Sequence, residues 1–297
     1  MIIKFKIRKV MLSKLKAKKV INACFAISMV FLCSCSASFT YNNLSWLSSF
    51  WVDDYIDLNK TQNKQLKQII NTTQAWHRST QLPAYKQDIQ NIKALFNTTL
   101  SNVQLKEQVV FAKKHWQNLL EYAHMPLAEL GATLSSEQRE ELLNNIQIKI
   151  NDEREEFNEQ TPLERKSERL EEQFEYYEQW IGKLNKQQKA LIKSTNEQHR
   201  DSGALWLEYK QTRLNAAKQV FKNAEITKKE FINQLSTVIK ERELYMSDAL
   251  LNTNEANLDL YINLLYELNS TLNDKQRQSV NDQFDELIET LNDIIES

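Results

Sequence analysis

Glycine and proline are scarce in this chain, since each occurs three times in 297 residues. β-Turns and glycine-rich loops depend on these residues, which argues against a β-sandwich, a β-barrel or a Rossmann-type sheet. Apolar residues recur instead at steps of three and four, the spacing of one face of an amphipathic helix. Two segments show this spacing: Leu105, Val109, Ala112, Trp116, Leu119 and Ala123, and Val280, Phe284, Leu287, Leu291 and Ile294. We predict an all-α fold of long amphipathic helices in an extended bundle.

A five-residue pattern, Leu-x-x-x-Gln, occurs four times where helices are expected to begin. The copies are Leu58–Gln62, Leu134–Gln138, Leu184–Gln188 and Leu272–Gln276. The second residue of each copy is Asn or Ser, which are good N-caps. The glutamine three residues later can reach back to the backbone N–H of the cap and close a capping box. The pattern therefore predicts helix starts at Asn59, Ser135, Asn185 and Asn273.

The N-terminal segment has the features of a bacterial lipoprotein signal. Residues 1–19 carry eight basic residues and no acidic one, and an apolar run follows from Val20 to Leu32. This run is shorter than the roughly 20 apolar residues of a transmembrane helix and matches the apolar region of a signal peptide. An uncleaved anchor is the alternative interpretation.

A lipidation signal places an apolar residue three before the cysteine and a small residue one before it. Leu32 and Ser34 fill these places before Cys35, whereas Cys24 lies inside the apolar run and Cys33 follows a bulky leucine. We predict a signal peptide at 1–34, a lipid on Cys35 and one helical periplasmic domain at 35–297, with a sub-boundary near 131–134. The serine at position 36 favours the periplasmic face of the outer membrane over the inner membrane.

The charge balance bears on the partners of the mature chain. Removal of residues 1–34 would leave 30 basic against 39 acidic residues. An acidic surface repels nucleic acid and anionic headgroups. We therefore expect no nucleic-acid partner and a membrane contact made through the N-terminal lipid.

Polar and aromatic residues gather in a short segment, at Trp76, His77, Arg78 and Tyr85. Pro83 between them is expected to begin a new helix, because proline is tolerated in a first turn. One interpretation is a helix–helix corner in which the indole and the arginine stack. The other is a binding pocket with Trp76 as its apolar wall and Arg78 as an anion anchor.

An aromatic cluster follows the expected lipid, comprising Tyr41, Trp46, Phe50, Trp51 and Tyr55. These residues either pack as core or rest on the membrane interface, where Trp and Tyr are favoured. The sequence leaves both interpretations open.

Three groups of residues resemble an uncharacterised family of Gram-negative all-helical lipoproteins. The groups are Tyr41-Asn42, Trp46, Trp51, Asp54-Tyr55 and Asp57-Leu58, then Trp76-His77-Arg78, Leu82-Pro83 and Tyr85, and finally Trp180 to Leu184 with Gln188 and the upstream Arg165 and Arg169. The resemblance implies an all-helical lipoprotein located in the cell envelope, but it implies no activity. The Leu-x-x-x-Gln helix starts are also similar to those of Spy-like periplasmic chaperones, although Asn or Ser replaces the threonine found there.

The sequence contains no Gly-x-Ser-x-Gly, His-Glu-x-x-His, Walker or Rossmann motif. We expect no catalytic residue, metal or cofactor. The favoured function is a non-enzymatic binding or scaffolding protein of the envelope with an envelope protein as partner. The alternatives are a chaperone-like client-binding protein and a carboxylate-dependent hydrolase of envelope polymers.

Overall fold

The computed structural model describes residues 33–98 and 100–297. This part of the chain is helical and contains no β-strand, so the prediction of an all-α fold is confirmed. Residues 1–32 of the expected signal peptide and the side chain of Cys35 lie outside the described part. The helices are, in chain order, α2 (Cys33–Asn42), α3 (Leu44–Asp53), α4 (Lys60–Trp76), the π-helical η1 (His77–Gln81), α5 (Leu82–Phe96), α6 (Asn102–Gly131), α7 (Ser136–Glu159), α8 (Pro162–Ile181), α9 (Lys186–Gln198), α10 (Gly203–Lys222), α11 (Lys228–Lys240), the 3-10 helix η2 (Arg242–Tyr245), α12 (Asp248–Ser270) and α13 (Asp274–Glu296).

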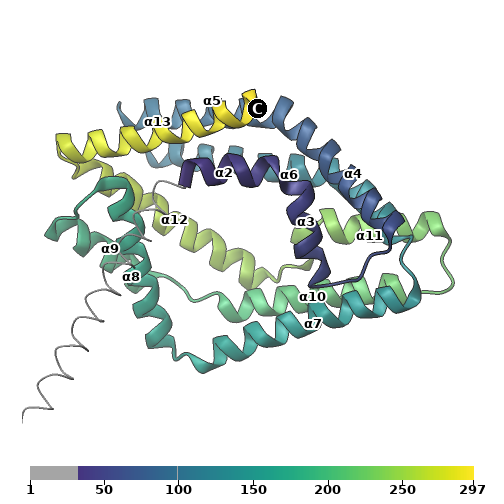
Figure 1. The fold of residues 1–297 in the computed structure, drawn as a ribbon. Coiled ribbons are helices and arrows are strands. Elements are labelled where there is room, and N and C mark those ends of the chain that lie inside the picture. The colour runs from purple at the N-terminus through teal and green to yellow at the C-terminus, as the bar shows by residue number, and fades with distance from the viewer. Residues whose placement is uncertain (1–32, 99) are drawn as a thin grey trace, which may run out of the picture.

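The helices form an open frame rather than a compact bundle (Figure 1). α5 and α13 lie together along one side of the frame, and α7 and α10 lie together along the opposite side. α4 connects the two sides at one end, and α8 and α9 lie at the other. The long α6 contacts α4, α5, α11 and α12, and therefore joins both halves of the molecule.

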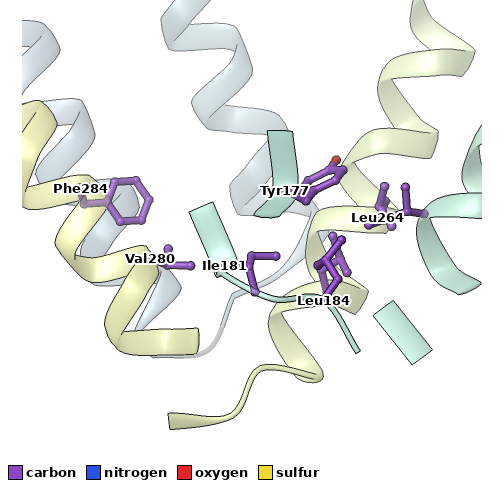
Figure 2. Packing of buried hydrophobic residues seen from close by; sticks show 8 residues of the cluster. Tyr177, Ile181, Leu184, Leu264, Val280 and Phe284 are labelled. Carbon is purple, nitrogen blue, oxygen red and sulfur yellow. The ribbon is translucent and has the colours of Figure 1, made fainter. Parts of the chain in front are cut away.

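One apolar core lies where α8, α9, α12 and α13 meet (Figure 2). Its fully or nearly fully buried members include Ile192, Leu264 and Leu268. Val280 and Phe284 of the predicted C-terminal stripe belong to this core and Ile294 is buried, whereas Leu287 of the same stripe is exposed, so this face of α13 is only partly covered. This core anchors one end of the frame.

The rest of the frame contains three smaller apolar clusters instead of one continuous core. The first is centred on Leu58, Leu66 and Leu134, between the starts of α4 and α7. The second packs α11 against α6 and α10, and the third packs α7 against α10. Phe221 packs against all three clusters, so they border one another.

All four predicted helix starts are confirmed. Asn59, Ser135, Asn185 and Asn273 are N-caps with extended backbone, and each forms a complete capping box with its glutamine. The leucine before each of the first three caps is buried. Capping therefore explains the spacing of the pattern.

The four glutamines also bind one another, which the sequence did not reveal. Gln62 pairs with Gln138, and Gln188 pairs with Gln276. In each pair the two side-chain amides donate to each other's carbonyl oxygen, at 2.9 and 2.8 Å in the first pair and 3.0 Å both ways in the second. Each amide also donates to the backbone carbonyl of the residue two positions before the N-cap of the partner helix. The acceptors are Thr133 for Gln62, Asp57 for Gln138, Thr271 for Gln188 and Lys183 for Gln276.

These contacts use the full bonding capacity of each glutamine amide. The carbonyl oxygen accepts from the amide of its partner and from the N–H of its own cap, as Gln188 does at 3.0 Å from Asn185. Gln188 is completely buried and Gln276 nearly so. A buried polar group is stabilising only when its hydrogen bonds are all made, so each glutamine depends on the other.

The predicted apolar stripe of α6 is only partly covered. Leu105, Val109 and Leu119 are half-buried, whereas Ala112 and Trp116 are exposed. The neighbours of α6 pack mainly on its last turns, where Ala128 and Leu130 are buried. The first half of this helix therefore keeps an exposed apolar surface.

We predict that Gln188→Ala lowers the free energy of unfolding by about 2–4 kcal/mol, because it leaves the buried Gln276 amide without its partner. Gln104→Ala is the matched control, since Gln104 closes a capping box with Ser101 without a glutamine partner. That change should cost about 0.5–1.5 kcal/mol. Denaturant unfolding of both variants measures the difference. Equal losses would show that the pairing adds nothing to capping.

Candidate functional site

The predicted corner lies where α4 and α5 join through the π-helical segment η1 (Figure 1). The helix at Pro83 begins where expected, with the proline in the first turn of α5. The chain nevertheless stays helical from Lys60 to Phe96, so no loop separates the two helices. π-Helical turns inside helices often occur at functional sites, and this one holds three of the four candidate residues at or next to the turn.

The π-helical turn has a local cause. Pro83 has no N–H, and its ring would crowd the carbonyl four residues earlier in a regular α-helix. The wider turn, in which the N–H of Leu82 bonds to the carbonyl of His77, gives the ring room. The hydroxyl of Thr80 also donates to the carbonyl of Trp76 at 2.7 Å. Proline and threonine thus shape the corner.

His77 is at the centre of the corner. Its Nδ1 lies 3.0 Å from the hydroxyl of Tyr41, and its Nε2 lies 3.1 Å from the hydroxyl of Tyr85. The Tyr85 ring packs against His115 with centroids 4.3 Å apart. His115 Nε2 lies 2.6 Å from a carboxylate oxygen of Asp88. The structure therefore joins α2, η1, α5 and α6 through one chain of polar aromatic groups.

Trp76 and Arg78 do not stack on each other, and that expectation is wrong. The indole of Trp76 stacks on Tyr122 of α6, with centroids 4.2 Å apart and ring planes at 8°. The guanidinium of Arg78 lies over the ring of Tyr41, 5.4 Å from its centroid, and donates to the side-chain carbonyl of Asn42. Successive residues of a helix point in different directions, so the two side chains reach different neighbours.

Arg78 makes no ion pair with a carboxylate in the described part of the chain. Its Nε is buried without a hydrogen-bond partner. The arginine keeps its charge at physiological pH and has five donors to satisfy. The hypothesis that this corner contributes to a binding surface stays a prediction.

Burial sets the protonation of the corner. Desolvation, and to a smaller extent the charge of His115, lowers the pKa of His77. Burial raises the pKa of Tyr85 and, against the opposing effect of Arg78, the pKa of Tyr41. A neutral imidazole can donate from one nitrogen and accept at the other. Neutral His77 between two protonated phenols therefore satisfies all three groups.

The N-terminal aromatic cluster divides between the two interpretations. Tyr41 is half-buried in the corner, and Tyr55 packs on the apolar cluster around Leu58. The remaining members, Trp46, Phe50 and Trp51, are each more than half exposed. The two tyrosines thus serve packing, and the other three side chains are exposed on α3.

A cavity of about 510 Å³ lies between the three smaller apolar clusters. Its walls come from the end of α3 and from α4, α6, α7, α10 and α11. Most lining side chains are aliphatic, among them Leu66, Leu130, Ile150, Leu214 and Val238. Small-molecule sites typically measure about 300–1,000 Å³ and have mainly apolar walls. This site has no signal in the sequence, because helical spacing does not show which apolar faces stay apart in the fold.

Charged groups line the cavity at one end, where α7 and α10 lie side by side. They are Lys149 and Glu153 of α7 and Lys210 and Arg213 of α10. Lys210 forms an ion pair with Glu153. Arg213 donates to the carbonyls of Val238 and Ile239 at the end of α11, at 3.0 and 3.2 Å. The cavity is therefore apolar with one cationic end.

The described residues offer no evident catalytic or metal centre. No aspartate or glutamate among them is buried, and they contain no cluster of three His, Cys, Asp or Glu side chains that could hold a metal ion. The helices of this part of the chain are too short or too polar to span a bilayer.

The fold and the cavity define an all-helical protein with a ligand-sized apolar site. The chain belongs to a family of unknown function, DUF6279, whose model matches residues 54–249. This confirms the resemblance to an uncharacterised family, and the matched region contains the corner and the segment from Trp180 to Gln188. No curated protein and no solved structure matches the chain, so no similarity to Spy-like chaperones is found.

The lowered pKa of His77 predicts a pH dependence of stability. The unfolded chain binds a proton at His77 near its usual pKa of about 6.5, whereas the folded chain binds it only at lower pH. Stability should therefore be greatest above this pH and fall as the pH drops from 7.5 to 5.5. Replacement of His77 by glutamine should reduce that fall.

Denaturant unfolding at both pH values measures this effect. Burial also lowers the pKa of His199, so His199→Gln should remove a separate part of the pH dependence. An unchanged pH dependence in His77→Gln would show that His77 is protonated as readily in the fold as in the unfolded chain.

Proposed function

We propose that this protein is a lipid-anchored, non-enzymatic binding protein that faces the periplasm from the outer membrane. The lipidation signal at Cys35 and the serine at position 36 support the anchor and the membrane. The observation that carries the binding function is the apolar cavity among α4, α6, α7, α10 and α11. We assign this cavity as the ligand site.

The apolar lining of the cavity argues for an occupant. The cavity is partly open to solvent, so without a ligand its apolar side chains stay in contact with water. Water gains little there, because it needs two to four polar partners. An apolar ligand is the occupant that would stabilise the fold.

The hydrolase alternative is less well supported. Hydrolysis of a glycosidic bond needs two carboxyl groups facing each other across a cleft, usually with one in an environment that raises its pKa. The acidic side chains of the described residues are exposed or half-exposed, and hydrogen bonds lower the pKa of Glu121, Glu137, Glu164 and Glu230. The geometry therefore favours binding over this chemistry.

The chaperone-like alternative has one observation in its favour. The first half of α6 exposes Val103, Val110, Phe111 and Trp116. Exposed apolar side chains along one helix can contact unfolded segments of another protein. These residues are scattered on the surface, whereas the cavity is concave, so we place the ligand in the cavity.

Lipidation is tested by metabolic labelling with a palmitate analogue. We predict that the wild-type protein carries the label and that Cys35→Ser does not. Cys24→Ser and Cys33→Ser are matched controls and should keep the label. Label that persists without Cys35 and disappears with one of the other cysteines would overturn the assignment.

Ligand binding is tested with a neutral sixteen-carbon alcohol that carries a photoreactive diazirine, added to membranes containing the full-length protein. Peptides of α7, α10 and α11 that line the cavity should be labelled. Ala217→Trp places an indole in the cavity from α10 and should reduce this labelling at least fivefold. Ala190→Trp, on an exposed position of α9, is the control and should change nothing.

Val52→Trp provides an independent test, because it fills the cavity from α3 if Ala217→Trp fails to fold. Circular dichroism establishes that each variant is folded. Unchanged labelling of the cavity peptides in both folded variants would refute the cavity as the ligand site.

A further inference from the structure

The cavity has two chemically different ends. Aliphatic side chains from α4 and α6, such as Leu66, Leu127 and Leu130, line one end. The charged side chains Lys149, Lys210, Arg213 and Glu153 line the other, on α7 and α10. A ligand that fits both ends needs a long apolar part and a polar head.

The net charge at the polar end of the cavity indicates which charge the head group of a ligand should carry. Three cationic side chains and one carboxylate give a local excess of two positive charges, in a chain whose formal net charge is −1. Glu153 already forms an ion pair with Lys210. Among the described residues, no carboxylate forms an ion pair with Lys149 or Arg213. An anionic head would supply a counter-charge to Lys149.

The volume of the cavity limits the size of the ligand. The cavity volume of about 510 Å³ lies in the range of small-molecule sites, about 300–1,000 Å³. A single-chain amphiphile such as a fatty acid or a lysophospholipid is a ligand of this size class.

We propose that the cavity binds a single-chain anionic amphiphile, with its acyl chain among the leucines of α4 and α6 and its head beside Lys149 and Arg213. The inference rests on the proposed binding function and names its ligand class. Lys149 is the residue that tests the head, because it is exposed at the polar end. Arg213 holds the end of α11, so its replacement would disturb the fold.

The experiment compares the photoreactive alcohol with a fatty acid of the same length and the same diazirine. In the wild-type protein the fatty acid should label the cavity peptides at least threefold more than the alcohol at equal concentration. Lys149→Glu should abolish this preference, and circular dichroism establishes that the variant is folded. Lys193→Glu, on an exposed position of α9, is the matched control and should keep the preference.

The outcomes separate the two proposals. Equal labelling by the acid and the alcohol would overturn the anionic head and leave the binding function standing. Labelling by neither probe would refute the binding function itself. A large gain of labelling in Cys35→Ser would show that the protein's own acyl chain fills the cavity, which would also overturn the inference.

The source of the amphiphile is determined by mass spectrometry of lipids extracted from the purified wild-type and Ala217→Trp proteins. Free fatty acid or lysophospholipid should accompany the wild type and be depleted at least fivefold in the variant. Either of these molecules supports the inference and identifies the source. A two-chain phospholipid or a neutral lipid depleted in the same way would overturn it.

Discussion

Two pairs of glutamine amides fix how the helices of this frame meet. Each pair joins the first turns of two helices whose glutamines lie 76 or 88 residues apart in the chain. Each amide also completes the capping box of its own helix, so helix capping and long-range contact depend on the same atoms. Hydrogen bonds in such a buried, fully satisfied network reinforce one another. The leucines beside the caps then pack into the apolar clusters at both ends of the frame.

The cavity lies in the half of the molecule that divides its apolar residues among three clusters, away from the core around Ile192 and Leu264. A methyl group at Gly131 would lie 2.5 Å from Leu235, so α6 and α11 already touch closely beside the cavity. This close contact of α6 and α11 therefore forms one wall of the cavity.

Local features of the fold could be predicted from the sequence, and its long-range contacts could not. The scarcity of glycine and the apolar spacing predicted the helices, and the Leu-x-x-x-Gln pattern predicted four of their starts, because capping involves neighbouring residues. The pairing of Gln188 with Gln276 depends on the folded arrangement and has no local signal. Likewise, Trp76, His77, Arg78 and Tyr85 were predicted as a group, but their partners Tyr41, Tyr122 and His115 come from other helices.

The contact of α2 with the corner limits how far the protein can extend from a membrane. Tyr41 binds His77 only six residues after Cys35, and α2 also contacts α13. Six helical residues span about 9 Å at 1.5 Å per residue. If Cys35 carries the proposed lipid, the tether between lipid and frame is therefore shorter than the frame's own long helices. Such a protein would work within the layer next to the bilayer, and a molecule that it binds would have to come to the membrane surface.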